Sequence, residues 1–371
     1  MPHVGIRVFN IQPWPLCYDN ALFNVSLCGS HGLSLWYATR PNNVLSVAGF
    51  LNEYANFADL ATFLANFRPD LNGNKFTVSL IDGGQNSQAP GTAGLEANLD
   101  IQYTVGLVNS APVNFFSSGL GNINGFINMA NAWLRQSPPP TVVSISYGFN
   151  ENQLSQSSAT TLCNIFAQLG ARGTSVLIAS GDGGVSGSRL NNTCTTFVPT
   201  FPASCPFITA VGATTGIPEV GAGLSAGGFS NYFPQPGYQT VAVAGYLSKL
   251  GGTYSGRFNR AGRAYPDISA QGDKILIVRN QTAILVAGTS ASTPITASVV
   301  ALINDRLITK ANRILGFLNP LIYAHPTVFN DIISGSNPGC STSGFPATGG
   351  WDPVTGYGTP NFPRMAAAIG I

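Results

Sequence analysis

Strand-like apolar runs alternate with helical segments through the middle of this chain. Residues 141–146 (TVVSIS) and 174–179 (TSVLIA) are apolar runs of strand length. Between them, Leu162, Phe166 and Leu169 recur at helical spacing. A strand, a crossover helix and a second apolar strand are typical of a parallel sheet that is covered on both faces. The pattern therefore predicts an α/β protein.

The composition favours a globular protein with a large core. The 371 residues are 44% hydrophobic and 9% charged, and the net charge is +2. A chain of this length can bury a sizeable core. The weak net charge predicts neither nucleic acid nor an anionic membrane as a partner. The apolar stretches are about ten residues long, whereas a membrane helix needs roughly 20.

Cysteines and glycosylation sequons indicate an oxidising compartment. The six cysteines, none in metal-ligand spacing, are Cys17, Cys28, Cys163, Cys194, Cys205 and Cys340. Cys17 and Cys28 can close a short loop, and the other four allow three pairings. Sequons begin at Asn24, Asn191 and Asn280 and fit a secretory route. Buried free thiols in a cytosolic protein are the alternative. The chain does not begin with a signal peptide, so secretion requires that an upstream segment was removed.

A strand, a small-residue turn and a helix place one serine where a nucleophile is expected. Residues 282–287 are predicted as a buried strand, with a helix after them. Pro294 suits the first helical turn, and Ser292 or Thr293 can cap it. Ser290 then lies at a strand end beside a helix N-terminus, where developing negative charge is stabilised. A serine-rich helix cap without chemistry is the alternative.

Three acids are candidates for proton transfer. If residues 91–100 are helical, Glu96 and Asp100 lie four apart on one face. No Lys or Arg occurs in that segment, so the pair is expected to share a proton, which is a common acid–base device. Asp182 follows the strand 174–179 in a glycine-rich turn, at the strand end where α/β proteins gather function. A solvated acidic face and an Asx turn are the alternatives.

Histidine is not expected to act as the base. The chain contains His3, His31 and His325. His31 and Asp82 together superficially resemble the pair in subtilisin, but the subtilisin order of Asp, His and Ser is reversed here. His31 is therefore interpreted as a loop residue.

Two loops near the C-terminus suit a hard cation. Asp331 precedes Ile332, and the run 349–352 (GGWD) ends in Asp352. Two carboxylates and several free carbonyls are ligands that Ca²⁺ prefers, although ordinary turns have the same composition.

These segments together resemble the sedolisins, the serine-carboxyl peptidases that share the subtilisin fold and use acids in place of histidine. The resemblance covers nearly the whole chain and, within the family, is nearest to the tripeptidyl-peptidases. The motifs are 94–100 (GLEANLD), 144–148 (SISYG), 179–184 (ASGDGG), 199–204 (PTFPAS), 227–231 (GGFSN), 262–267 (GRAYPD), 288–294 (GTSASTP), 317–320 (FLNP), the 331–352 region and 351–362 (WDPVTGYGTPNF).

The resemblance implies a role for each candidate acid and for the serine. Ser290 would be the nucleophile, Glu96 the general base, Asp100 the residue that orients Glu96, and Asp182 an acid in the oxyanion hole. Ala287 stands where the family usually has Ser, which should leave the turn intact. Near pH 4 a histidine with a pKa of about 6.5 is protonated, whereas a Glu of about 4.3 is still a usable base.

The resemblance also implies one structural Ca²⁺ ion. Its ligands would be the carboxylates of Asp331 and Asp352 and the carbonyls of Ile332, Thr348 and Gly350. Thr348 replaces a Gly of the family, but the expected contribution is a carbonyl that any residue offers.

The implied fold is a single subtilisin-like α/β domain with a mainly parallel, seven-stranded sheet flanked by helices and a C-terminal Ca²⁺-binding loop. Residues 1–371 would be the mature catalytic domain, without the signal and pro-segment of the family. The implied activity is release of tripeptides at acid pH from free N-termini of peptides or unfolded proteins. An endopeptidase of the same mechanism and a catalytically silent secreted binding protein are the alternatives. The protein is expected to be a monomer and to be bound by its own pro-segment before activation. Its expected location is extracellular, with a lysosome or vacuole as the alternative.

Overall fold

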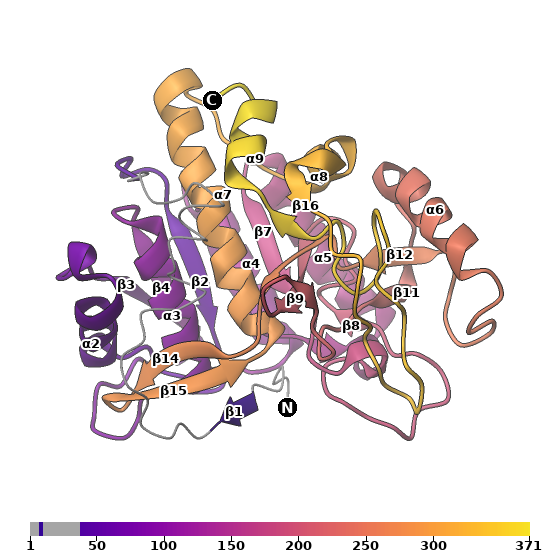
Figure 1. Cartoon of the computed structure of the whole chain (residues 1–371). Coiled ribbons are helices and arrows are strands. Elements are labelled where there is room, and N and C mark those ends of the chain that lie inside the picture. The colour runs from indigo at the N-terminus through magenta and orange to yellow at the C-terminus, as the bar shows by residue number, and fades with distance from the viewer. Residues whose placement is uncertain (1–6, 10–37) are drawn as a thin grey trace.

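The computed structural model describes residues 7–9 and 38–371, and its centre is a mainly parallel sheet (Figure 1). The sheet order is β10-β9-β7-β5-β2-β4-β3, and β13 also pairs with β9. The parallel strands are β2 (Leu45–Gly49), β3 (Thr77–Ile81), β4 (Val113–Ser118), β5 (Val142–Ile145), β7 (Ser175–Ala179), β9 (Thr209–Thr215) and β13 (Ile268–Gln271). The predicted α/β class is confirmed. Besides the seven expected strands, the two-residue β10 (Val220–Gly221) pairs antiparallel with β9.

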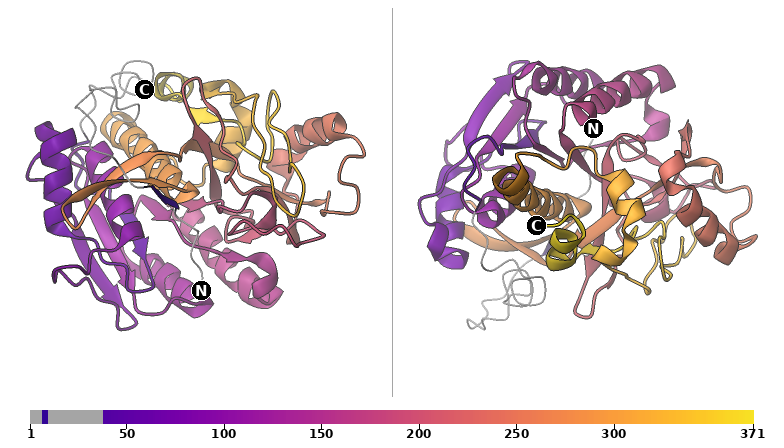
Figure 2. Two further views of the ribbon diagram at one scale, coloured as in Figure 1. Left: turned by 60° about the horizontal axis from the view of Figure 1, so that its bottom comes forward. Right: turned by 90° about the horizontal axis from the view of Figure 1, so that it is seen from above.

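Helices cover both faces of the sheet, because its strands carry apolar residues on both sides. Val47 of β2 belongs to the core beneath α3 (Leu95–Val108) and α7 (Thr289–Ala311). The next residue, Ala48, packs in the opposite core beneath α4 (Ile123–Arg135) and α5 (Gln156–Ala171). The other helices of the described part are α2 (Phe57–Phe67), α6 (Thr240–Leu250), α8 (Asn319–Ala324) and α9 (Phe362–Ala368). The right panel of Figure 2 shows the long helix α7 almost along its axis.

A separate three-stranded sheet lies across α3. It consists of β1 (Arg7–Phe9), β15 (Thr282–Ala287) and β14 (Ile275–Arg279), all antiparallel. The prediction that 282–287 is a buried strand is wrong for its first half, because Thr282 and Ala283 lie at the exposed tip of the hairpin and only Val286 and Ala287 are buried. Gln102 of α3 donates to the Val278 carbonyl (2.6 Å) and accepts from its N–H (2.8 Å). These two bonds fix α3 against β14.

The remaining short strands of the described part form two-stranded pairs. They are β6 (Phe149–Asn150) with β8 (Thr200–Phe201), β11 (Gly228–Pro234) with β12 (Gly262–Tyr265), and β16 (Phe329–Asn330) with β17 (Thr359–Pro360). None of the described helices is both long and apolar enough to span a bilayer.

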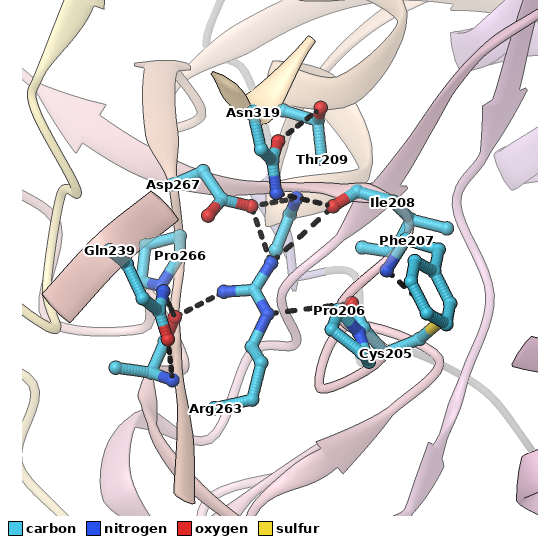
Figure 3. Close-up of polar contacts among 12 residues, drawn as sticks. Cys205, Pro206, Phe207, Ile208, Thr209, Gln239, Arg263, Pro266, Asp267 and Asn319 are labelled. Carbon is cyan, nitrogen blue, oxygen red and sulfur yellow. Dashed lines mark hydrogen bonds and ion pairs between the residues drawn. The ribbon is translucent and has the colours of Figure 1, made fainter. Parts of the chain in front are cut away.

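A buried ion pair joins β12 to β9 and α8 (Figure 3). Arg263 and Asp267 are fully buried, and Arg263 Nη2 lies 2.6 Å from Asp267 Oδ2. The guanidinium also donates to the carbonyls of Cys205, Ile208 and Ala264. Asp267 accepts from the N–H of Ala210 (2.8 Å) and from the Tyr323 hydroxyl (2.9 Å). Every charged atom of the pair is thereby solvated by protein dipoles, as a buried ion pair requires.

Four of the cysteines form disulfides, which resolves the pairing that the sequence left open. The bonds join Cys163 to Cys205 and Cys194 to Cys340. The predicted pairing of Cys17 with Cys28 lies outside the described residues, as do His3, His31 and Asn24.

Candidate active site

Ser290 is fully buried in the first turn of α7. The helix begins earlier than predicted, at Thr289, with Gly288 at its N-cap. Pro294 therefore lies beyond the first turn. Ser292 and Thr293 do not cap the helix: their hydroxyls donate to the carbonyls of Ala270 and Thr289, both at 2.9 Å. The prediction erred because the cap comes from a residue that is distant in sequence.

That cap is Asp182, which follows β7. Its Oδ1 accepts from the Thr289 N–H (2.7 Å) and the Thr289 hydroxyl (2.9 Å). The carboxyl group thus meets the positive end of the α7 dipole. Gly288 leaves room for it, since a Cβ at that position would lie 2.9 Å from Asp182 Oδ2.

Pro294 leaves a carbonyl of α7 free to contact the end of β5. A proline has no N–H, so the helical hydrogen bond from position 294 to the Ser290 carbonyl is missing. The Ser146 hydroxyl, directly after β5, lies 3.3 Å from that carbonyl. In return, the Ser290 hydroxyl lies 3.3 Å from the Ser146 carbonyl and donates to it. Ser290 is thereby anchored to the carboxyl end of the sheet.

Glu96 and Asp100 lie in α3, and both are buried, with 2% and 0% of their surface exposed. Asp100 Oδ1 accepts from the Ser146 hydroxyl at 2.7 Å. Burial raises the pKa of Glu96 well above its usual range, and the charges of Asp100, Glu53 and Asp182 raise it further, whereas the Ser290 hydroxyl lowers it. Burial likewise raises the pKa of Asp100, and the bond from Ser146 opposes that shift. Such a pair is expected to hold one proton between its two carboxyl groups.

The structure brings Ser290, Glu96, Asp100 and Asp182 into one site. His325, the one histidine in the described part of the chain, is exposed at the C-terminal end of α8. Asp82 is also exposed, where it accepts from Asn128. No described histidine contacts the serine.

Three residues of the site were missed from the sequence. Ser146 links Asp100 to α7, Thr289 receives Asp182, and Glu53 accepts from the Glu96 N–H at 3.1 Å. A serine at the end of an apolar strand is a usable signal for Ser146. The contact between Glu53 and Glu96 could not be predicted from the spacing of the two residues in the sequence.

The predicted cation ligands lie in two neighbouring loops. Asp331 Oδ2 accepts from the Gly350 N–H (2.7 Å), and Asp352 Oδ2 accepts from the Thr348 N–H (2.9 Å). The two carboxylates therefore accept from the same loop, at backbone N–H groups that are two residues apart. Asp352 is fully buried, and burial raises its pKa to about 7. The described residues contain no cluster of three or more His, Cys, Asp or Glu side chains, so a cation here would depend on backbone carbonyls.

A mainly parallel sheet with a serine at a helix N-terminus and carboxyl groups around it defines a subtilisin-like α/β serine peptidase. Residues 73–312 match the Subtilase family. The chain belongs to this family. The predicted resemblance to the sedolisins, or serine-carboxyl peptidases, is confirmed by the named relatives below.

Named relatives agree with this assignment. The chain is 41% identical over 369 residues to the probable tripeptidyl-peptidase SED3 of Arthroderma benhamiae, covering 90% of this chain and 62% of that protein. It is 40% identical over 366 residues to tripeptidyl-peptidase SED2 of Arthroderma otae, covering 89% and 61%. The chain therefore spans less than two thirds of these relatives. Pseudomonas sedolisin, a serine-carboxyl proteinase solved with pseudo-iodotyrostatin, has the same fold, with a TM-score of 0.73 at 23% identity over 91% of this chain and 95% of that one.

Proposed function

We propose that this protein is an acid-acting peptidase in which Ser290 is the nucleophile and Glu96 the general base. The observation that carries the proposal is the grouping of a buried serine with three buried carboxyl groups, next to which no described histidine lies. Glu96 would take the proton as Ser290 Oγ attacks the scissile carbonyl. Asp100, held by Ser146, would orient Glu96 and carry the shared proton.

Asp182 is proposed to stabilise the tetrahedral oxyanion. Its Oδ1 accepts two hydrogen bonds from Thr289, so a proton on this carboxyl would be on Oδ2. A neutral carboxylic acid can donate to an oxyanion, whereas an ionised one would repel it. The proposed chemistry therefore needs an ionised base and a protonated Asp182 at the same pH.

The proposed product is a tripeptide released from a free N-terminus. The relatives named tripeptidyl-peptidases support this choice over an endopeptidase. The test is mass spectrometry of the products from a peptide and its N-acetylated form. Tripeptides from the free peptide alone are expected. Internal cleavage of the acetylated form would favour the endopeptidase.

The same assay across pH 3 to 8 tests the mechanism. We expect kcat/KM to fall above about pH 6, as the acid that serves the oxyanion ionises. Ser290→Ala should abolish turnover with an unchanged melting temperature, and Asp182→Asn should retain part of the donor function. Equal kcat/KM at pH 4 and pH 8 would contradict the mechanism. Absence of turnover at every pH, with no labelling of Ser290 by an acyl or aldehyde reagent, would favour a silent binding protein.

One structural Ca²⁺ ion is proposed between the two C-terminal loops. Asp331 and Asp352 would supply carboxylates, and Ile332, Thr348 and Gly350 would supply carbonyls. The donor set fits, because these three carbonyls accept no hydrogen bond from the described residues and a buried carboxylate such as Asp352 requires a counter-charge. The ion would hold the two loops together.

Secretion is proposed as well. Two disulfides support an oxidising destination. The sequon residues Asn191 and Asn280 are both exposed and would accept glycans. A monomeric enzyme held inactive by its own pro-segment remains a prediction.

A further inference from the structure

The turn after β2 brings a carboxylate to the N-terminus of α3. The Glu53 N–H donates to the Phe50 carbonyl at 3.1 Å, which closes the turn. Leu51 and Asn52 between them have φ angles of 61° and 59°. Left-handed backbone is costly for a branched residue such as Leu, and such costs concentrate at functional sites. The turn directs Glu53 Oε2 to the Glu96 N–H, which it accepts at 3.1 Å.

Gly94 makes this approach possible. It is the N-cap residue of α3 and, having no side chain, gives the helix no cap. A Cβ at position 94 would lie 2.2 Å from Glu53 Oε2 and 2.7 Å from the backbone nitrogen of Tyr54. The Gly94 N–H donates to the Tyr54 carbonyl at 2.9 Å, which holds the two segments together. Glu53 thus occupies the position that a capping side chain normally takes.

The N-terminus of α7 has the same arrangement. Gly288 is its N-cap residue, and Asp182 accepts from the first helical N–H. Each helix that carries a candidate catalytic group is therefore capped by a carboxylate from a turn that follows a strand of the central sheet. Asp182 already has a proposed role in the chemistry, whereas Glu53 has none.

Glu53 adds to the negative charge around Glu96. The titratable groups that face Glu96 are Asp100 on the same helix, Asp182 after β7, Tyr147 after β5, and Glu53. Arg279 of β14 is a cation at this end of α3, and its Nε donates to the Ala93 carbonyl at 2.8 Å. Burial of Glu96 is the main cause of its raised pKa, and the charges of Asp100 and then Glu53 add to it.

We infer that Glu53 is a positioning residue for the base: it caps α3 at Glu96, and its charge sets the pH range in which Glu96 accepts the Ser290 proton. The inference rests on the proposed role of Glu96. Glu53 touches no reacting atom in this scheme and acts only through the helix and through its field.

The test is the pH profile of kcat/KM for Glu53→Gln and Glu53→Ala. Gln keeps an oxygen that can accept from the Glu96 N–H but removes the charge. Its acidic limb should move to lower pH by roughly 0.5 to 1 unit, because removing a nearby negative charge lowers the pKa of Glu96. Its melting temperature near pH 4, where protonated Glu96 carries no charge, should not change. Ala should show the same displacement and, having lost the cap, a lower melting temperature.

Glu219→Gln is the matched control. Glu219 is another half-buried carboxylate and accepts from Thr214 and Thr359, but it does not contribute to the pKa of Glu96. Its profile should coincide with that of the wild type. A Glu53→Gln profile that also coincides with the wild type would overturn the inference and leave Glu53 a structural cap. Wild-type activity in Glu96→Gln or Ser290→Ala would instead overturn the proposed function, and the inference with it.

Discussion

Ionised Glu96, the form needed for the proposed catalysis, should lower the stability of the folded protein. Its raised pKa means that the folded protein binds a proton more tightly than the unfolded chain does. The stability linked to this group is therefore greatest below the unfolded pKa of about 4.3 and is lost as pH rises through the folded pKa.

Glu96→Gln removes this penalty. We expect a variant without peptidase activity whose melting temperature at pH 7 exceeds that of the wild type by a few degrees, while the two agree near pH 4. Calorimetric scans at both pH values measure this. A lower melting temperature for the variant at pH 7 would show that ionised Glu96 stabilises the fold instead.

The candidate acids and the serine were predictable at the residue scale because each lies at an identifiable place in a local pattern. Asp182 and Ser290 follow apolar runs, and Glu96 and Asp100 have helical spacing. The residues that position these groups were not predictable. Glu53 reaches Glu96 only because two residues adopt left-handed backbone and residue 94 has no side chain. These conditions follow from tertiary approach, which spacing along the chain does not encode.

At the scale of elements, β12, β9 and α8 depend on the buried pair of Arg263 and Asp267 (Figure 3). Asp267→Asn leaves the guanidinium buried without its counter-charge. The free energy of unfolding should fall by about 3–5 kcal/mol, measured by urea denaturation. Asp70→Asn is the control, because its ion pair with Arg68 is partly exposed and should contribute about 1 kcal/mol or less. Equal losses in the two variants would contradict this reading of the buried pair.

Among the central strands, β5 and β7 were predictable, because both are short, fully buried apolar runs with a helix between them. The start of α7 and the exposed half of β15 were not. Asp182, more than 100 residues before α7, satisfies its first N–H, so no local cap marks the helix start. The apolar sequence of β15 predicts a buried strand, but the first half of this strand pairs only with β14 and is not covered by a helix. In both cases a contact distant in sequence decides the local structure.

At the scale of the whole molecule, the Ca²⁺ proposal predicts that folding stability depends on the ion. A ligand that binds only the folded state stabilises it by about 2.7 kcal/mol at 100 times its Kd. EDTA should therefore lower the melting temperature by several degrees, and added Ca²⁺ should restore it, whereas Mg²⁺ should not, because it demands stricter octahedral geometry. Differential scanning calorimetry is the measurement.

Two variants distinguish loss of the proposed Ca²⁺ ion from a general effect of EDTA on the melting temperature. Asp331→Asn weakens the proposed site and should reduce the response to Ca²⁺ and EDTA. Asp82→Asn changes an exposed aspartate in a turn after β3 and should keep the full response. If the wild type melts at the same temperature in EDTA and in Ca²⁺, the loops are held by their hydrogen bonds to Asp331 and Asp352 alone. In that case the raised pKa of Asp352 should make the metal-free protein less stable as pH rises from about 4 through about 7, because only the protonated group is buried without cost.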